Sequence, residues 1–290
     1  MKHLFIVNPH SGHKQRQKLV VDLLKKYPQD DYQIAYTEYA GHATELSTLA
    51  AKKGVPFVTA IGGDGTVNET ASGLVGSQTA FGIVRTGSGN GFARSLGIPL
   101  NLTKAIDAVF SEKIKPVDVG CVDNHYFFTT AGIGFDAHIS EYFQHNQFRG
   151  FLPYLYYGIR TFFRYDYPTY SIFTEDERLH VEPLTISFAN GREYGNGAVI
   201  APGAKIDDGL LELCIIERLN LFHGISGLYA MFAGHLQKRG YYSHRSGMEF
   251  RVESDSGSIL YHTDGEPHHA RSPLTISVKK HALNVIFKQG

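Results

Sequence analysis

The residues best suited to chemistry form a glycine-rich turn with one carboxylate. Residues 62–69 read Gly-Gly-Asp-Gly-Thr-Val-Asn-Glu, directly after the apolar run 55–61 and at the head of a predicted helix. Glycines allow backbone N–H groups to approach phosphate oxygens, and the helix N-terminus adds partial positive charge. An aspartate repels a phosphate unless a divalent cation lies between them. Asp64 therefore predicts Mg²⁺ in a phosphate site.

The same turn has a second, purely structural interpretation. Thr66 and Glu69 have the Ser/Thr-x-x-Glu spacing of a capping box, which closes the start of many helices. The two interpretations are compatible. The turn matches neither the Gly-x4-Gly-Lys-Ser/Thr loop nor the Gly-x-Gly-x-x-Gly fingerprint, so it lacks the usual nucleotide-binding signatures.

Three further turns contain residue types that bind ions or phosphates. Residues 8–12 read Asn-Pro-His-Ser-Gly, residues 205–210 contain Asp207-Asp208-Gly209, and Asp264-Gly265 follows the strand-like run 258–263. Each also fits an ordinary turn, because these residue types favour turn conformations and Asp-Gly is a common hairpin pair. Residue types alone leave these alternatives open.

Two successive patterns must position these turns. Up to about residue 120, β-rich apolar runs alternate with helical patterns, which predicts β-α-β units on a parallel sheet. Ligands of such sheets bind at the carboxyl ends of the strands. From about Gly120 the runs are closely spaced, which predicts a mainly antiparallel β domain with helical insertions at 139–164 and 221–238.

Composition agrees with two packed domains and excludes several classes of protein. The 290 residues are 42% hydrophobic and 19% charged, so the chain has ample apolar surface for packed cores. The 28 basic and 28 acidic residues balance, which gives no basic field for a nucleic acid. Cys121 and Cys214 lie in apolar runs, which predicts buried thiols and a reducing cytosol. No run reaches the ~20 apolar residues of a membrane span, and residues 4–7 are too few for a signal peptide.

Residues 62–69 resemble the nucleotide-binding signature of the diacylglycerol kinase catalytic domain, which sphingosine and ceramide kinases share. NAD kinases and phosphofructokinases share only the shorter Gly-Gly-Asp-Gly core, so Asn68-Glu69 favours the lipid kinases. Further matches follow in the family's order over almost the whole chain, at residues 8–12, Thr37 with 41–43, 87–94, 118–120, 132–136, 204–210 and 264–267.

The resemblance implies a fold and an activity. The expected α/β fold has a Rossmann-like nucleotide-binding domain, similar to NAD kinase and diacylglycerol kinase, over residues 1–119. A mainly antiparallel β-sandwich domain for the lipid substrate is expected over 120–281, with a last strand at about 282–290 that packs back onto the first domain. The implied enzyme binds ATP between the domains and transfers its γ-phosphate, with Mg²⁺, to a hydroxyl of a membrane lipid met at the bilayer surface.

The resemblance also implies roles for individual residues. The expected ATP contacts are Asn8, Pro9, His10, Ser11, Gly12, Thr37, Gly63, Asp64, Gly65, Thr66, Val67, Asn68, Glu69 and Ser88, with Glu266 also helping to hold the nucleotide. Asp264 is the expected general base that accepts the proton of the lipid hydroxyl, which is a role that phosphoryl transfer uses. Asp64 and Asp118 are expected to organise Mg²⁺ through water. Asp208, with the carbonyl oxygens of Lys205 and Leu210, is expected to hold a second, structural Mg²⁺.

One position departs from the family pattern. Many bacterial members have Asp where this chain has Gly91, so a carboxylate of the magnesium network is missing. The segment Gly-Ser-Gly-Asn followed by a small residue is more similar to the sphingosine and ceramide branch. The lipid is therefore expected to be diacylglycerol-like or sphingoid, and the sequence leaves that choice open.

Two other functions compete with a lipid kinase. A soluble NAD kinase-like enzyme would need no lipid, and Asn68-Glu69 argues against it. A non-catalytic nucleotide-sensing module would not need Asp264. The aromatic stretch 142–167, which contains Arg149, Arg160 and Arg164, suits a membrane interface, an acyl pocket or core packing. We expect a cytoplasmic protein in transient peripheral contact with the membrane, and a homodimer is compatible with the sequence.

Overall fold

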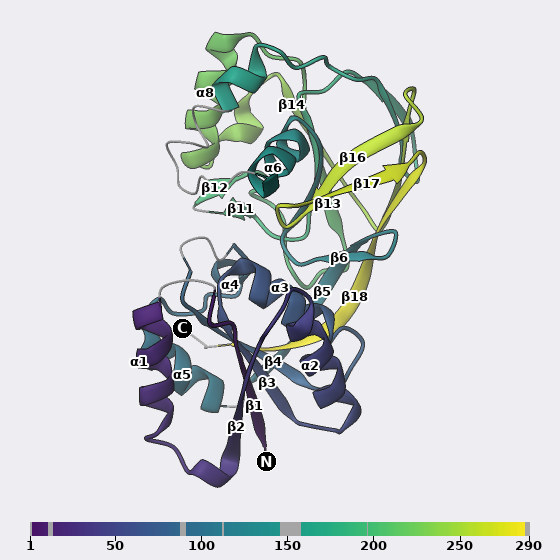
Figure 1. Cartoon of the computed structure of the whole chain (residues 1–290). Coiled ribbons are helices and arrows are strands. Elements are labelled where there is room, and N and C mark those ends of the chain that lie inside the picture. Colours follow the sequence, from purple (N-terminus) through teal and green to yellow (C-terminus); the bar gives the residue numbers. More distant parts are fainter. Residues whose placement is uncertain are drawn as a thin grey trace. The chain divides into compact units, whose positions relative to one another are not determined.

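The computed structural model of the 290-residue chain describes residues 2–10, 14–87, 91–111, 113–145, 158–195 and 197–287 (Figure 1). The chain divides into two units, of which unit 1 comprises residues 1–119 and 280–290 and unit 2 comprises residues 120–279. Strands β5 (Ile114–Val122) and β18 (Leu274–Ile286) each contribute residues to both units.

Unit 1 is an α/β sheet of parallel strands. Its order is β2-β1-β3-β4 followed by the end of β18, where Val285 lies opposite Phe81. The strands are β1 (His3–Val7), β2 (Tyr32–Tyr36), β3 (Phe57–Gly62) and β4 (Ala80–Arg85). Every residue of β1, β3 and β4 is buried, as expected for parallel strands covered by helices on both faces.

Helices cover this sheet. They are α1 (Lys14–Leu24), α2 (His42–Lys52), α3 (Asp64–Ser72), α4 (Gly91–Ser95) and α5 (Leu102–Phe110), with the short η1 (Gln29–Asp31). Phe5, Leu24, Ile61 and Ile106 belong to one buried cluster that joins strands to helices. The alternation of apolar strands and helices thus produces the parallel α/β fold that the sequence predicts.

Unit 2 is an antiparallel β-sandwich. One sheet has the order β14-β13-β10-β7-β16-β17, and the other pairs the first part of β18 with β15, β8 and β9. The strands are β6 (His125–Phe127), β7 (Thr130–Gly134), β8 (Tyr170–Phe173), β9 (Arg178–Val181), β10 (Thr185–Ala189), β13 (Leu211–Ile216), β14 (Tyr242–Gly247), β15 (Glu249–Ser254), β16 (Ser258–Thr263) and β17 (Glu266–Arg271), with the small pair β11 (Glu193–Gly195) and β12 (Ala198–Val199). Phe188 of one sheet packs on Phe250 of the other with ring centroids 5.3 Å apart. The predicted antiparallel β domain is therefore confirmed.

Helical segments interrupt the sandwich near both predicted places. Helix α6 (Phe135–His145) begins earlier than the predicted insertion and packs against β16 and β17. A second helical turn covers residues 158–162. The other insertion forms α8 (Leu221–Phe232) and η2 (Leu236–Lys238). Within the aromatic stretch 142–167, Tyr165 joins a buried cluster, as core packing predicts, whereas Phe163 is exposed. Contact of this stretch with a membrane interface or an acyl pocket stays a prediction, and Arg149 lies outside the described residues.

The cysteines and the hydropathy agree with the sequence analysis. Cys121 and Cys214 are buried thiols, and burial raises the pKa of Cys214 to about 12. Among the described residues, no helix is long and apolar enough to cross a membrane.

Candidate active site

The carboxyl ends of the parallel strands of unit 1 bring the predicted nucleotide-binding segments together. Val7 lies opposite both Tyr36 and Ile61, so β1, β2 and β3 end in the same row. The residues that follow are tied together through the main chain, because Thr37 N donates to Val7 O at 2.9 Å and Asn8 N donates to Ile61 O at 3.4 Å. This edge of a parallel sheet is where such folds bind ligands.

The loop after β1 is an Asx turn anchored to α1. Asn8 Oδ1 accepts a hydrogen bond from His10 N at 2.9 Å, and Asn8 O accepts one from Gln17 Nε2 at 2.5 Å. Pro9 lies inside this turn. The described part of the segment forms the predicted turn. Its place at the carboxyl edge of the sheet is also compatible with the predicted contact with ATP. The predicted ATP contacts Ser11, Gly12 and Ser88 lie outside the described residues.

The glycine-rich turn forms the start of α3. Gly63 is the N-cap, and Asp64 and Gly65 occupy the exposed first turn. The first amides of a helix lack intrahelical acceptors and point toward solvent or a ligand. A Cβ at Gly62 would lie 2.6 Å from Thr66 Cβ, so glycine is required there for packing. A Cβ at Gly65 would meet no atom within 4 Å, so packing gives no reason for that glycine.

The capping-box prediction for Thr66 and Glu69 is wrong. The helix begins at Asp64, which puts Thr66 inside it, where its side chain is buried. Glu69 Oε2 instead accepts from Ala43 N at 3.3 Å, in the first turn of α2, and Thr44 Oγ1 donates to Glu69 O at 2.9 Å. Glu69 therefore joins α3 to the N-terminus of α2, where the helix dipole favours a carboxylate. Of the remaining predicted contacts, Val67 is buried and Asn68 Oδ1 accepts from Ser72 Oγ at 3.4 Å.

A group of arginines lies at the same carboxyl edge of the sheet, and it was not predicted from the sequence. Arg85, the last residue of β4, is 5% exposed, and its Nε has no hydrogen-bond partner within the described residues. Burial lowers the pKa of Arg85, and the charges of Arg94 and Arg16 lower it further, while Asp64 opposes the shift. A guanidinium stays charged nevertheless. The three arginines therefore make this edge electropositive beside Asp64, and an arginine ending the apolar run Ala80 to Val84 was the available signal.

In unit 1, the side chain of Asp118 forms a hydrogen bond with a main-chain amide. Its side chain is completely buried in β5, and Asp118 Oδ1 accepts from His281 N at 2.7 Å. His281 has a φ of 51°, an uncommon conformation for a residue with a side chain. The carboxylate thus stabilises the irregular point in β18, and the predicted contact with Mg²⁺ through water stays a prediction.

In unit 2, Asp264 begins a tight turn and is fixed by three main-chain amides. Thr263 pairs with Glu266, so Asp264-Gly265 is a two-residue hairpin turn between β16 and β17. Asp264 has a φ of 49°, which such turns require. Its Oδ2 accepts from Phe128 N at 2.7 Å, and its Oδ1 accepts from Thr129 N at 2.9 Å and Thr130 N at 3.0 Å. The hairpin prediction is correct, and the carboxylate is held in one orientation.

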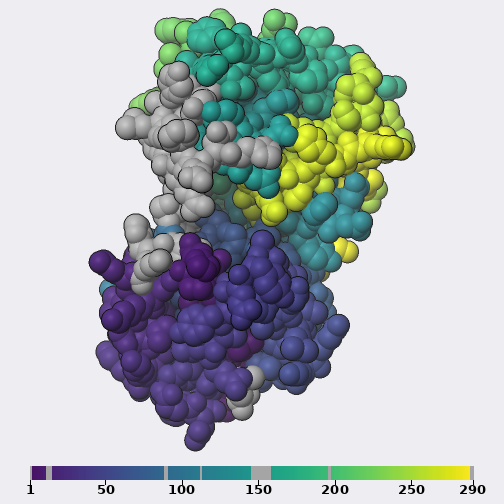
Figure 2. Space-filling model, viewed as in Figure 1, coloured from purple at the N-terminus to yellow at the C-terminus, as the bar shows by residue number. Residues whose placement is uncertain are grey.

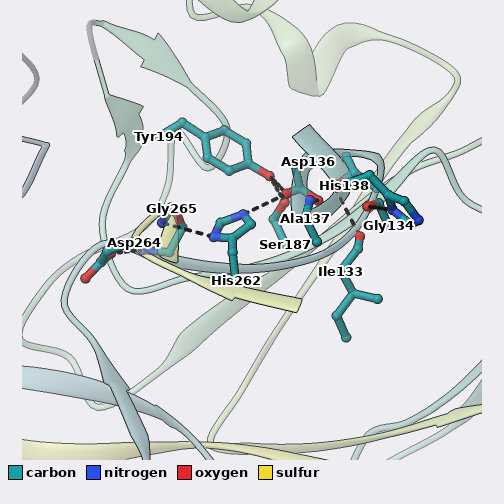
Figure 3. Close-up of polar contacts among 12 residues, drawn as sticks. Ile133, Gly134, Asp136, Ala137, His138, Ser187, Tyr194, His262, Asp264 and Gly265 are labelled. Carbon is teal, nitrogen blue, oxygen red and sulfur yellow. Dashed lines mark hydrogen bonds and ion pairs between the residues drawn. The ribbon is translucent and has the colours of Figure 1, made fainter. Parts of the chain in front are cut away.

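A buried polar network supports this turn (Figure 3). His262 Nδ1 accepts from Gly265 N at 3.2 Å, so the proton is on Nε2, which donates to Asp136 Oδ2 at 3.1 Å. Tyr194 OH donates to the same oxygen at 2.7 Å and also contacts Ser187 Oγ. Burial raises the pKa of Tyr194 well above its ordinary value.

Glycine makes room for this network. A Cβ at Gly132 would lie 2.2 Å from Asp136 Oδ2 and 2.4 Å from His262 Nε2. The segment 132–136 carried part of the family resemblance, but the partner of Asp136 lies 126 positions away and was not predicted. Glu266, which follows the turn, is exposed.

The segment 205–210 forms a turn in which Asp208 is exposed. Asp208 Oδ1 accepts from Leu210 N at 3.1 Å, and Gly209 has a φ of 80°. Within the part of the chain that the structure describes, no three His, Cys, Asp or Glu residues form a metal site. The donor set predicted here contains one carboxylate and the carbonyls of Lys205 and Leu210, which suits Mg²⁺ chemically. This site stays a prediction.

Comparison with known families decides the class. Residues 2–122 match the diacylglycerol kinase catalytic domain, and residues 129–287 match the YegS C-terminal NAD kinase beta sandwich-like domain. The chain belongs to the diacylglycerol kinase and YegS-like family of bacterial lipid kinases.

Relatives in this lipid kinase family align over most of the chain. A diacylglycerol kinase of Bacillus subtilis (strain 168) is 30% identical over 231 residues, which are 74% of each chain. A "Probable lipid kinase YegS-like" protein of Pseudomonas aeruginosa (strain UCBPP-PA14) is 29% identical over 254 residues, covering 86% of this chain and 82% of its own.

Solved structures share the fold of this lipid kinase family. A crystal structure from Bacillus anthracis (strain Sterne) superposes with a TM-score of 0.78 at 25% identity, covering 99% of this chain and 97% of its own. The crystal structure of a diacylglycerol kinase from the same strain has a TM-score of 0.73 at 23% identity over the same shares.

Proposed function

We propose that this lipid kinase transfers the γ-phosphoryl group of Mg-ATP to a hydroxyl group of a diacylglycerol-like or sphingoid lipid. The proposal rests on the carboxyl edge of the sheet in unit 1. There the exposed N-terminus of α3 lies beside the arginine group of Arg16, Arg85 and Arg94. Helix amides and guanidinium groups are the donors that bind phosphate groups. The open space at Gly65 adds support, because a ligand explains a glycine that packing does not require.

The chemistry of the exposed Asp64 supports a metal-bound nucleotide. When bound, Mg²⁺ would neutralise charge that develops on the transferred phosphoryl group. In unit 1, Asp64 is the carboxylate suited to hold Mg²⁺, because its oxygens are hard ligands and Asp64 lies at the carboxyl edge of the sheet, where the phosphate groups would bind. The arginine group would bind and orient the phosphate chain, which is the main protein contribution to phosphoryl transfer.

Asp264 is the proposed general base. Three main-chain amides orient its carboxylate, so it needs no reorganisation to accept the proton of a lipid hydroxyl. Asn at this position keeps the backbone conformation, because Asn tolerates positive φ. The Asp264→Asn variant therefore loses the negative charge of the side chain. Its amide NH₂ group replaces one carboxylate oxygen, so one of the three hydrogen bonds from main-chain N–H groups is lost.

The test measures transfer of labelled γ-phosphate to detergent-dispersed diacylglycerol, monoacylglycerol, phosphatidylglycerol, ceramide and sphingosine, with NAD as a soluble control. We expect one lipid to be labelled and Asp264→Asn to lower kcat roughly 10²- to 10⁴-fold while ATP still binds. The matched control is Asp123→Asn, at the first position of the two-residue turn between β5 and β6, where φ is also 49°. Labelling of NAD alone would refute the lipid acceptor, and equal losses in both variants would refute the role of Asp264.

A further inference from the structure

Helix α8 exposes apolar side chains that an ordinary surface helix would bury. Its 12 residues, Leu-Phe-His-Gly-Ile-Ser-Gly-Leu-Tyr-Ala-Met-Phe, include no Lys, Arg, Asp or Glu. Phe222 is 79% exposed, Tyr229 73% and Ile225 65%. Leu221, Leu228 and Phe232 are also exposed, and atoms of this part of the chain, green in Figure 2, lie on the molecular surface. Large apolar groups gathered in this way mark an interaction surface.

The exposed side chains form one face of the helix. Residues 222, 225, 229 and 232 recur at intervals of three and four, which places them on one side. The other side packs on unit 2, where Ala230 is completely buried and Gly227 lies against the ring of Tyr241. The helix is therefore anchored by its small residues and directs its large apolar residues outward.

A neighbouring helical turn extends the apolar face. A Cβ at Gly224 would lie 3.5 Å from the ring of Phe162, so the turn 158–162 packs beside α8. Ile159 is 48% exposed and Phe163 is 65% exposed. We call this surface, formed by the exposed apolar residues of α8 with Ile159 and Phe163, the α8 face.

The charges around the α8 face are mainly positive. Five cations occur in segments 158–167 and 217–239, against two acids, Asp166 and Glu217. The cations are Arg160, Arg164, Arg218, Lys238 and Arg239. Lys238 belongs to η2, which packs against α8, and the Arg218 guanidinium lies 4.8 Å from the centroid of the Tyr167 ring. The α8 face therefore combines an apolar centre with a basic rim.

We propose that the α8 face docks the protein onto an anionic lipid bilayer by inserting its apolar side chains at the boundary between headgroups and acyl chains. Aromatic residues favour that boundary, and a basic rim is attracted to anionic headgroups. A second copy of the chain is a poorer occupant, because a two-fold symmetric contact would bring the two basic rims together. The inference deepens the proposed function, since an enzyme that acts on a membrane lipid must reach the bilayer.

Sedimentation with lipid vesicles tests this docking without ATP or turnover. The vesicles contain phosphatidylcholine alone or mixed with phosphatidylglycerol, and the variant is Phe222→Ser/Tyr229→Ser. We expect its partition coefficient on the mixed vesicles to fall at least about ten-fold. The matched control, Leu19→Ser/Leu49→Ser, changes two exposed leucines of α1 and α2, 50% and 49% exposed, and should stay within about two-fold of wild type.

A charge variant keeps the inference testable if the apolar variant folds poorly in thermal melting. Arg160→Glu/Arg164→Glu should weaken binding to the mixed vesicles more than ten-fold, because each cation near an anionic surface strengthens binding roughly five-fold. The control for charge is Lys26→Glu, an exposed site in unit 1.

Three results would overturn the docking surface. The first is binding of the α8 variants at wild-type strength, and the second is no binding of the wild type. The third is a dimer in sedimentation velocity that the α8 variants convert to monomer, which would make a second copy the occupant. Phosphorylation of detergent-dispersed lipid reports on the proposed function separately, because it needs no docking. Vesicle binding without any kinase activity would refute the function alone, and kinase activity without α8-dependent binding would refute the docking alone.

Discussion

Replacing His262 with alanine should destabilise unit 2 and loosen the turn that carries Asp264. His262 is 3% exposed and makes two hydrogen bonds, accepting from Gly265 N and donating to the Asp136 carboxylate. A neutral hydrogen bond contributes about 1 kcal/mol and one to a carboxylate about 2 kcal/mol. The alanine variant should therefore lose about 3 kcal/mol of unfolding free energy, before any cavity cost.

Two conservative variants separate the two bonds. His262→Asn places an oxygen near the position of Nδ1, which keeps the acceptor for Gly265 N–H and loses about 2 kcal/mol. His262→Gln reaches the position of Nε2, which keeps the donor to Asp136 and loses about 1 kcal/mol. Only His262→Gln should speed exchange of the Gly265 amide hydrogen, and it should lower kcat more than His262→Asn while KM for ATP stays constant. That pattern would make His262 a positioning residue.

The assays suit a chain without tryptophan. Urea unfolding is followed by near-ultraviolet circular dichroism of the tyrosines, and hydrogen exchange is read on peptides that contain the Asp264 turn. An alanine variant that loses less than about 1 kcal/mol would refute the energetic reasoning. Equal exchange of Gly265 in the Asn and Gln variants would refute the assignment of the two ring nitrogens.

The other predictions concern both units. Arg85→Met should raise KM and Kd for ATP about 10- to 100-fold, measured by kinetics and calorimetry, with Arg245→Met in unit 2 as the control; unchanged ATP binding would contradict the phosphate role. Burial lowers the pKa of His3 to about 3, so the unfolded state takes up a proton below pH 6.5 and the folded state does not. Wild type should therefore lose about 1.4 kcal/mol per pH unit more than His3→Gln as pH falls from 6.5 toward 4, and equal slopes in acid unfolding would refute this. Mg²⁺ without nucleotide should raise the Tm of wild type and of Asp207→Asn but not of Asp208→Asn, and an equal rise in all three would exclude Asp208 as the ligand.

Features set by local pattern could be predicted from the sequence. Continuous apolar runs separated by helices dictated the parallel sheet of unit 1, and short runs with turns dictated the antiparallel sandwich of unit 2. The Asp264-Gly265 hairpin follows from the preference of that pair for positive φ. The buried state of Cys121 and Cys214 follows from their apolar neighbours.

Features set by distant contacts could not be predicted in this way. Arg16, Arg85 and Arg94 come from a helix, a strand and another helix, and only the sheet brings their charges together. The Asp136–His262 pair also depends on tertiary packing. The capping-box interpretation of Glu69 is wrong, because the side chain accepts from Ala43 N, which belongs to another helix.

The direction in which an apolar helix faces is also a tertiary property. The composition of α8 alone suits a helix buried on all sides. Only the packing of Gly227 and Ala230 on unit 2 shows that its large residues face outward.

The course of β18 has a consequence for how the protein is made. Leu283, Val285 and Ile286 are buried in unit 1, and Val285 lies beside Phe81 of β4. A ribosome releases residues 1–119 long before residues 283–286 emerge, so the sheet that holds the glycine-rich turn lacks this strand while the sandwich is being synthesised. Contacts between such distant segments form slowly. Unit 1 is thus completed only after unit 2 has been translated, and loss of residues 283–286 would damage unit 1 rather than the sandwich.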